Sequence, residues 1–242
     1  MMSELGRFLT KSEKDYRNKR KNVISSTNSL LVADNPFLFA NRINVSEAIA
    51  RYELFKKILN VSGAVVECGV HNGNNLLLFS HLSSILEPYA INRKIIGFDT
   101  FSGFSSIQKK DPDDINEKNF DDVDLNALKE AINLYDMNRA AGHMKRVEIV
   151  QGDAVKTIET YINNNPELII AMLYLDFDIY KPTKVALDKL APLVCRGGII
   201  AFDQINYEKF PGETEALKEY FNLNEIKIER FYFDPFIGYI VL

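Results

Sequence analysis

The most constraining feature of this chain is its alternation between short apolar runs and segments with the apolar spacing of a helix. Alternation of this kind is typical of a parallel sheet with helices on both faces. The continuously apolar runs agree, because a parallel strand is covered on both sides. The predicted strands are residues 64–69, 94–99, 146–151, 168–176 and 197–203. The predicted helices are residues 44–59, 75–86, 125–139, 154–163, 183–193 and 213–221.

The C-terminal end breaks this alternation. Residues 227–233 and 236–242 have the pattern of two strands, with Asp234 and Pro235 between them as a turn. A turn this short cannot make a parallel crossover, so this pair is antiparallel. The sequence therefore predicts an α/β fold: a doubly wound, mostly parallel, seven-stranded sheet that ends in an antiparallel hairpin.

The segment before the first predicted strand is different in character. Residues 1–60 are predicted to form an N-terminal helical extension or arm, and residues 61–242 the main domain. Within the arm, Asn44 and Glu47 have the spacing of a helix start, with Asn44 as the expected cap. We expect this extension to recognise a ligand and to make subunit contacts.

Composition excludes several classes of protein. The chain has 29 basic and 33 acidic residues and a net charge of −4, whereas nucleic-acid binders usually carry a basic excess. Two cysteines, Cys68 and Cys195, are too few for a disulfide scaffold or a four-cysteine zinc site. No apolar run is long enough to span a membrane, and the charged N-terminus does not resemble a signal peptide. We expect a cytoplasmic protein with no nucleic-acid or membrane partner.

Acidic residues occur at or just after the end of every one of the five parallel strands. Ligands of an open α/β sheet bind outside the carboxyl ends of its strands, so these side chains are predicted to share one site. The five residues are Glu67, Asp99, Asp153, Asp176 and Asp203.

The loop after the first strand is rich in glycine but does not match the dinucleotide fingerprint. Its sequence at residues 67–73 is Glu-Cys-Gly-Val-His-Asn-Gly, which fits Gly-x-Gly-x-x-Gly in neither register. A nicotinamide dehydrogenase is therefore disfavoured. Glycines at 69 and 73 allow the backbone to approach an amino-acid carboxylate and a ribose, and Glu67 can pair with an ammonium group.

Two further acids extend this interpretation. Asp99, at the end of the second strand, is placed to bind both hydroxyls of a ribose. Asp153, in Gly-Asp-Ala after the third strand, is placed to accept from an adenine amino group. Together with the glycine loop, they predict a site for an adenosyl amino acid, namely S-adenosylmethionine.

At this point the chain resembles a class I S-adenosylmethionine-dependent methyltransferase and, more narrowly, the macrocin-type (TylF-type) sugar O-methyltransferase family. The resemblance runs from about residue 60 to the C-terminus. It is carried by the motifs at residues 65–73, 97–104, 152–154, 173–183 and 197–203, and by Pro211-Gly212. It implies the Rossmann-like methyltransferase fold, and the cofactor-binding residues it implies are Glu67, Gly69, His71, Asn72, Gly73, Asp99, Thr100, Phe101, Asp153 and Ala154.

The resemblance also implies magnesium-dependent methyl transfer to a sugar hydroxyl. By position, Asp176 is a metal ligand, Asp178 is the candidate general base, and Asp203 with the next residue completes the metal site. The family usually has Asp-Asp here, whereas this chain has Asp203 followed by Gln204, which keeps a carbonyl oxygen but carries no charge.

The catalytic candidates are Asp176, Asp178 and His71. If the fourth strand continues, alternation places Asp176 and Asp178 on one side, where a cation relieves their repulsion. The alternative role of Asp178 is to cap the helix that begins near Pro182. His71, in the glycine loop, is a second candidate base.

Several alternatives remain open at the level of sequence. A catechol-type metal-dependent O-methyltransferase has a similar fold, and Gln204 allows a non-catalytic cofactor-binding subunit. Residues 111–124 contain seven acids and are either a solvated loop or a mobile lid. The expected acceptor is a small molecule or a glycan, and the resemblance favours a homo-oligomer.

Overall fold

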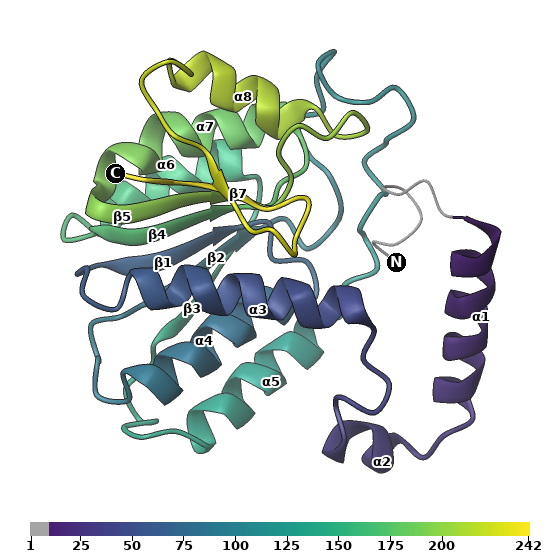
Figure 1. Ribbon diagram of the computed structural model, residues 1–242. Helices are drawn as coiled ribbons and strands as arrows, with labels where there is room; N and C mark the ends of the chain where they lie inside the picture. Colours follow the sequence, from purple (N-terminus) through teal and green to yellow (C-terminus); the bar gives the residue numbers. More distant parts are fainter. Residues whose placement is uncertain (1–9) are drawn as a thin grey trace. The chain divides into compact units, whose positions relative to one another are not determined.

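The computed structural model describes residues 10–242 and contains two compact units, Met1–Ile49 and Ala50–Leu242 (Figure 1). The part of the expected arm before residue 10 lies outside the described residues. The division of the chain into domains at residue 60 stays a prediction.

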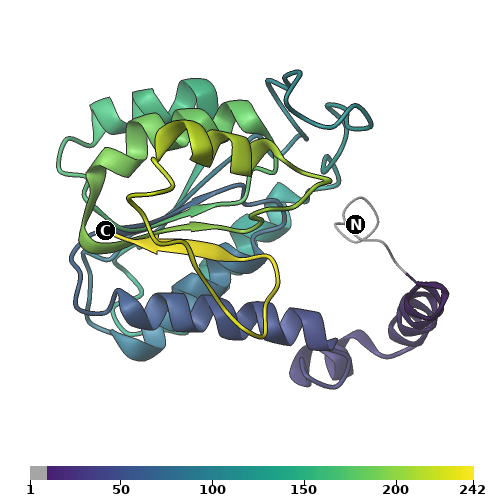
Figure 2. The same cartoon turned by 45° about the horizontal axis from the view of Figure 1, so that its top comes forward.

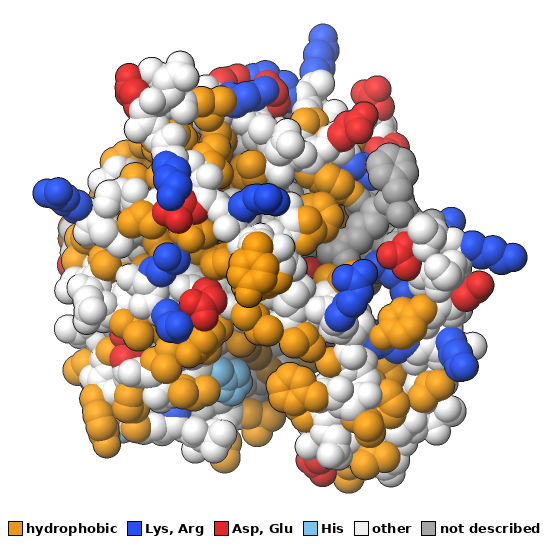
Figure 3. Space-filling model, viewed as in Figure 1, with side chains coloured by type: hydrophobic (Ala, Val, Ile, Leu, Met, Phe, Trp, Pro, Cys, Tyr) orange, Lys and Arg blue, Asp and Glu red, His pale blue; other side chains and the backbone are white. Residues whose placement is uncertain are grey.

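The smaller unit contains helices α1 (Lys11–Ser25) and α2 (Ser29–Asp34). A capping box begins α1, because Thr10 accepts from the Glu13 N–H and the Glu13 carboxylate accepts from the Thr10 N–H. Neither helix has a buried residue. Apolar side chains are therefore present on the surface of this unit, as the space-filling view shows (Figure 3).

Helix α3 (Arg42–Lys57) begins in the smaller unit and ends in the larger one. The prediction that Asn44 caps this helix is wrong. Asn44 lies inside the first turn, and its N–H donates to the side chain of Asn41, 2.8 Å away. A second asparagine three residues earlier takes the capping position, and sequence spacing alone did not separate the two.

The larger unit is built on a seven-stranded sheet of order β3-β2-β1-β4-β5-β7-β6. The first five strands pair in parallel, and β7 is antiparallel to both β5 and β6. This confirms the predicted doubly wound sheet with an antiparallel C-terminal edge. The strands are β1 (Ala64–Cys68), β2 (Ile95–Asp99), β3 (Val147–Gln151), β4 (Ile170–Leu175), β5 (Val194–Phe202), β6 (Glu229–Arg230) and β7 (Gly238–Val241).

The connection between the last two strands is longer than predicted. The segment 231–237 joins β6 to β7, so the expected two-residue turn is wrong although the antiparallel direction is right. Asp234 shapes the connection, because its carboxylate accepts from the N–H groups of Phe236 and Ile237. Local hydrogen bonding by an aspartate therefore competes with the strand pattern here.

Helices cover both faces of the sheet (Figures 1 and 2). Alternate residues of β1 show this directly, because Val65 belongs to one hydrophobic cluster while Val66 and Cys68 belong to another. The first cluster includes residues of α3, α4 and α5, and the second includes residues of α6, α7 and α8. Besides α3, these helices are α4 (Asn74–Leu86), α5 (Leu125–Met137), α6 (Ala154–Asn164), α7 (Tyr180–Leu190) and α8 (Gly212–Tyr220).

None of the helices within residues 10–242 combines the length and the apolar character that crossing a membrane requires.

Candidate active site

The glycine loop passes directly against the end of the neighbouring strand. Gly69 has a φ of +100°, and a Cβ placed on it would lie 2.0 Å from the carbonyl oxygen of Asp176. The loop also turns at Gly73, whose φ of +82° precedes α4. Any residue other than glycine at position 69 would push the ends of β1 and β4 apart.

Asp99 holds this loop in place. One oxygen of its carboxylate accepts from the N–H groups of Val70 and His71, both at 2.8 Å, and the other accepts from the Phe101 N–H at 2.6 Å. The side chain thus connects the end of β2 to the glycine loop. The predicted contact of Asp99 with a ribose stays a prediction, and these hydrogen bonds add a second role to it.

Asp153 likewise connects two segments of the site through its carboxylate. It is the N-cap of α6, accepting from the Val155 N–H at 3.1 Å, and it also accepts from the hydroxyls of Ser105 and Ser106. Ala154 is the first residue of that helix and is buried. The segment after β2 is therefore joined to the start of α6, at the place where an adenine was predicted to bind.

The remaining predicted cofactor residues shape these two loops. The Thr100 hydroxyl donates to the carbonyl oxygen of Gly103 at 2.5 Å, and Phe101 is buried. The amide of Asn72 lies 3.2 Å from the ring nitrogen Nδ1 of His71. All of these side chains lie in the turns that follow β1 and β2.

Three non-glycine residues of the predicted site have a left-handed backbone: His71 (φ 48°), Phe101 (φ 54°) and Asp178 (φ 62°). Such a conformation costs about 1–3 kcal/mol per residue and persists only where its surroundings enforce it. Its occurrence on the loops after β1, β2 and β4 is typical of a functional site.

Glu67 is a buried carboxylate that lacks a hydrogen-bond partner within the described part of the chain. The residue is 0% exposed, and neither carboxylate oxygen makes a hydrogen bond of normal geometry, although the side chain of Asn75 approaches the carboxylate. Burial raises the pKa of Glu67 well above its usual range, and the positive charge of Arg51 acts in the opposite direction. An orphaned buried carboxylate fits a cationic ligand group such as an ammonium.

Four acids gather where β4 and β5 end and α8 begins: Asp176, Asp178, Asp203 and Glu213. Arg51 is their nearest described cation, and its guanidinium lies 2.8 Å from Asp203. Tyr174 donates to the same oxygen of Asp203 at 2.5 Å. Acids therefore outnumber the cation at this edge of the sheet.

This crowding changes the protonation of the candidate base. Burial, with the charge of Asp203 as a second cause, raises the pKa of Asp178 to about 8. Burial and the charges of Asp203 and Asp178 raise the pKa of Asp176 as well. The two acids therefore interact, although β4 ends at Leu175 and the expected continuation of the strand is wrong.

The alternative that Asp178 caps the following helix is also wrong. Ile179 occupies the N-cap position of α7, and no side chain caps that helix. Pro182 lies in the first turn of α7, which begins at Tyr180 and so three residues earlier than predicted. The side chain of Asp178 is thus available for another role.

The side-chain amide of Gln204 has a hydrogen bond at its nitrogen but none at its oxygen. Its Nε2 donates to Asp178 Oδ1 at 2.8 Å, whereas its Oε1 is buried and has no hydrogen-bond partner among residues 10–242. Hard cations accept such carbonyl oxygens as ligands. An orphaned oxygen beside several buried carboxylates fits a divalent cation.

The ligand set of such a cation would be unusual. Across the described residues, no three His, Cys, Asp or Glu side chains are arranged to hold a metal ion. Asp203 already binds Arg51 and Tyr174 through one oxygen. A metal at this edge would therefore depend on Gln204 in addition to Asp176 and Asp203.

Sequence reasoning missed two residues of this cluster, Arg51 and Glu213. Glu213 is 0% exposed and accepts from the backbone N–H groups of Asp178 and Gln204. Pro211-Gly212 was a signal for a helix start there, but nothing in the sequence showed that Glu213 points inward.

The acidic segment 111–124 is anchored at both of its ends. Asp111 is buried and accepts from the N–H groups of Gln108 and Tyr180, both at 2.7 Å. Near the other end, Asp122 lies 3.3 Å from Nε2 of His71, and the ring of Phe120 contacts the His71 ring edge-on. Burial raises the pKa of Asp111, whereas the hydrogen bond with His71 lowers that of Asp122.

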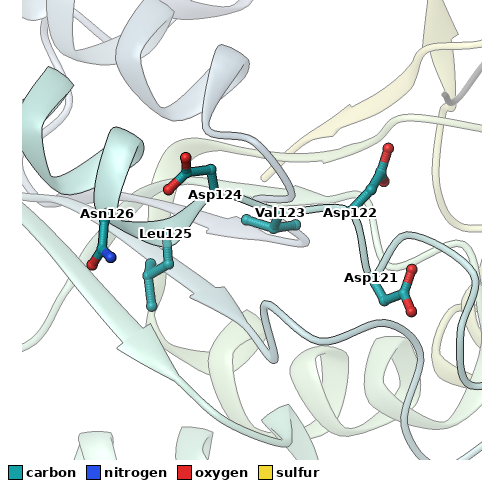
Figure 4. Close-up of a pocket in the computed structure, with 6 residues that line it drawn as sticks. All are labelled: Asp121, Asp122, Val123, Asp124, Leu125 and Asn126. Carbon is teal, nitrogen blue, oxygen red and sulfur yellow. The ribbon is translucent and has the colours of Figure 1, made fainter.

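This segment also borders an open pocket of about 550 Å³, lined by residues 121–126 (Figure 4). The solvated-loop interpretation therefore does not describe Asp111, which is enclosed. The contact of Asp122 and Phe120 with His71 places the segment against the glycine loop. A lid over that loop stays a prediction.

Comparison with known proteins decides the family. The sequence pattern of the macrocin O-methyltransferase (TylF) family matches residues 34–239. The chain belongs to this family. It is therefore an S-adenosylmethionine-dependent O-methyltransferase, as the resemblance implied. A comparison with curated proteins found no match.

Solved structures agree with this assignment. A calicheamicin methyltransferase, CalS11, is 27% identical with a TM-score of 0.90, over 98% of this chain and 95% of that one. An apo structure of CalS11, described as a TDP-rhamnose 3′-O-methyltransferase, is 26% identical with a TM-score of 0.84, over 99% and 98%. The O-methyltransferase NovP, at 20% identity and a TM-score of 0.64 over 81% and 79%, shares the fold. The predicted methyltransferase fold is confirmed.

Proposed function

We propose that this TylF-family O-methyltransferase transfers the methyl group of S-adenosylmethionine to a hydroxyl of a sugar, free or carried by a nucleotide or a glycoside. The observation that carries the proposal is the likeness to CalS11, which extends over nearly the whole of both chains. CalS11 is described as a TDP-rhamnose 3′-O-methyltransferase. The acceptor is thus a small molecule or a glycan.

The cofactor is proposed to bind across the loops after β1, β2 and β3. The Glu67 carboxylate suits the ammonium of the methionine part. The loop through Gly69 is the proposed partner of the methionine carboxylate. Asp99 and Asp153 are the proposed partners of ribose and adenine, with His71, Asn72, Gly73, Thr100, Phe101 and Ala154 around them. Serine hydroxyls that now donate to Asp153 are weak partners that an adenine amino group can replace.

In the transfer step, the protein's main task is to orient an oxygen in line with the methyl carbon and the sulfur. The sulfonium of the cofactor supplies a methyl group on a good leaving group. Asp178 is the proposed general base, because its side chain is fixed by Gln204 and it lies beside Asp176 at the ligand edge of the sheet. Its ionised form, whose share rises as the pH approaches its raised pKa of about 8, takes the proton as the hydroxyl oxygen forms its bond to carbon.

A magnesium ion is a further part of the proposal. Asp176, Asp203 and Gln204 would hold it, and the excess of buried acids together with the free Oε1 of Gln204 supports this choice. A bound divalent cation would lower the pKa of the acceptor hydroxyl and orient it. His71 is the second candidate base, and its contact with Asp122 keeps it at the edge of the glycine loop.

Calorimetry with S-adenosylhomocysteine, in magnesium and in chelator, tests the cofactor site first. Turnover is then followed as S-adenosylhomocysteine formation with TDP-rhamnose, other nucleotide sugars, simple glycosides and catechol. Methylation of a sugar substrate, lost in Asp178→Asn, is the expected result. Turnover of catechol alone would show that the enzyme is a catechol-type O-methyltransferase. Cofactor binding without turnover of any acceptor would favour the non-catalytic alternative.

We also propose a cytoplasmic homo-oligomer. The support for self-association is the smaller unit, in which α1 and α2 have no buried residue and Leu30 and Phe37 are exposed. Short helices are marginal in water unless an apolar face is covered. Sedimentation of the full chain and of a chain truncated before Ala50 would show whether these helices join subunits.

A further inference from the structure

Glu213 connects two loops of the site through one side chain. Its Oε1 accepts from the Asp178 N–H at 3.2 Å, and its Oε2 accepts from the Gln204 N–H at 3.3 Å. The first loop follows β4 and the second follows β5, and Glu213 itself lies in the first turn of α8. The carboxylate is fully enclosed, so water does not replace either contact.

The residue that Glu213 holds has an unfavourable backbone. Asp178 has a φ of 62°, in the left-handed region that most side-chain-bearing residues avoid and that aspartate enters more readily than most, with local hydrogen bonds to hold it. Its backbone N–H is bound by Glu213, and its carboxylate is bound by the Gln204 amide at 2.8 Å. Since Glu213 also binds the Gln204 backbone, it acts on Asp178 directly and through Gln204.

Helix capping does not explain why this carboxylate is buried. Glu215 lies in the same first turn, is half-buried, and pairs with Lys218, so it already places a negative charge at the start of α8. Enclosing a second carboxylate beside Asp178 and Asp203 is costly, and both of these acids raise the pKa of Glu213 further. A cost of this kind indicates a role in the site.

We propose that Glu213 is a positioning residue, which fixes Asp178 and Gln204 in the geometry that presents Asp178 to the acceptor hydroxyl. This inference rests on the proposed role of Asp178 as the base. Glu213 does not touch the reacting atoms and is not itself a catalytic residue. Its effect is therefore on the transfer step and not on the binding of the cofactor.

The test compares Glu213→Gln and Glu213→Ala with the matched control Glu215→Gln. The glutamine variant keeps one acceptor oxygen but turns an amide N–H₂ toward the other backbone N–H, and the alanine variant loses both acceptors. Turnover is divided by the number of S-adenosylhomocysteine-binding sites measured by calorimetry, so that unfolded protein is not counted. With the sugar acceptor, we expect kcat per site to fall about tenfold in the glutamine variant and about a hundredfold in the alanine variant.

The acceptor KM and the S-adenosylhomocysteine Kd should change by no more than about twofold, because the cofactor loops keep their contacts with Asp99. Glu215→Gln should leave kcat unchanged. A kcat per site that stays at the wild-type value in both Glu213 variants would overturn the proposal, even if their melting temperatures fall. That result would assign Glu213 a purely structural role.

A second measurement does not depend on turnover. Crystal structures of the wild type and of Glu213→Ala are compared. In the variant, Asp178 should leave the left-handed region and lose its contact with Gln204, whereas the wild type keeps both. An unchanged Asp178 in the variant overturns the positioning role. If the wild type methylates no acceptor, the proposed function fails by itself, and this structural comparison still decides the role of Glu213.

Discussion

The guanidinium of Arg51 and the carboxylate of Asp203 form a buried ion pair with a separation of 2.8 Å, between two residues far apart in the chain. The Arg51 guanidinium also lies 5.5 Å from the centre of the Tyr174 ring, and Tyr174 donates to the same Asp203 oxygen. Helix α3 thereby contributes the cation of an otherwise acidic cluster. Three elements, α3, β4 and the end of β5, meet at this pair.

Arg51→Met should therefore destabilise the protein strongly. Removing one partner leaves Asp203 buried and uncompensated, which costs about 3–5 kcal/mol of the free energy of unfolding. Urea unfolding of the variant measures this loss. The control is Lys56→Met on the same helix, where an exposed pair with Glu53 is worth about 0–1 kcal/mol. Equal losses in the two variants would contradict the role given to Arg51.

Gly69→Ala should abolish the site geometry. Its Cβ would meet the Asp176 carbonyl oxygen at 2.0 Å, in a backbone conformation that alanine avoids. We expect a loss of more than about 2 kcal/mol in stability and loss of S-adenosylhomocysteine binding in calorimetry. Gly197→Ala is the control, because Gly197 also has a positive φ but its Cβ would lie 3.6 Å from Val61. Retained cofactor binding in Gly69→Ala would show that the loop is free to move away from β4.

The sequence predicted the part of the site that follows strand ends. Glu67, Asp99, Asp153, Asp176 and Asp203 were proposed because parallel strands bring their carboxyl ends to one edge, a rule that needs only strand positions. The mostly parallel sheet and its antiparallel C-terminal edge followed from the same pattern, whereas the order of the strands comes from the structure.

The rest of the site was not predictable because it depends on side-chain direction. Arg51 lies on a helix with many charged residues, where an arginine usually faces water, and its partner is 152 positions away. Glu213 has the sequence context of an exposed first-turn acid, as Glu215 does. The position of Asp178 depends on a left-handed backbone conformation, which the apolar run before it does not predict.

The stability of the metal-free protein should fall as the pH rises toward 8. Burial raises the pKa of Asp178 to about 8 from an ordinary value of 3.8, so between these values the folded state binds more protons than the unfolded state. The stability gained from the protonated form is complete at low pH and is lost as the pH rises through about 8. Thermal unfolding in chelator from pH 5.5 to 9 would show the decline.

Asp178→Asn is the reference for this measurement, because it removes the titrating group and should flatten the curve. Other buried acids, such as Asp176 and Glu213, keep a part of the slope, since burial raises the pKa of each. The prediction concerns the difference between the two proteins. Parallel curves over this range would show that Asp178 is ionised in the folded protein.

Gln204→Asp should strengthen the binding of a divalent cation. The change restores the acidic pair that the family usually has, and it replaces a neutral carbonyl oxygen, which has no partner in the described chain, with a charged one. We expect the Kd for Mn²⁺, measured by electron paramagnetic resonance, to fall about tenfold relative to the wild type. The control is Gln108→Asp, a substitution of the same kind outside the cluster, which should leave the Kd unchanged.

The same variant should not become a faster enzyme. Its side chain no longer donates to Asp178 Oδ1, and it adds another negative charge next to that carboxylate. Turnover at saturating Mg²⁺ should therefore remain at or below the wild-type value while the metal affinity rises. A variant with weaker Mn²⁺ binding would show that Gln204 is not a ligand, and one with tighter binding and faster turnover would show that its hydrogen bond to Asp178 is dispensable.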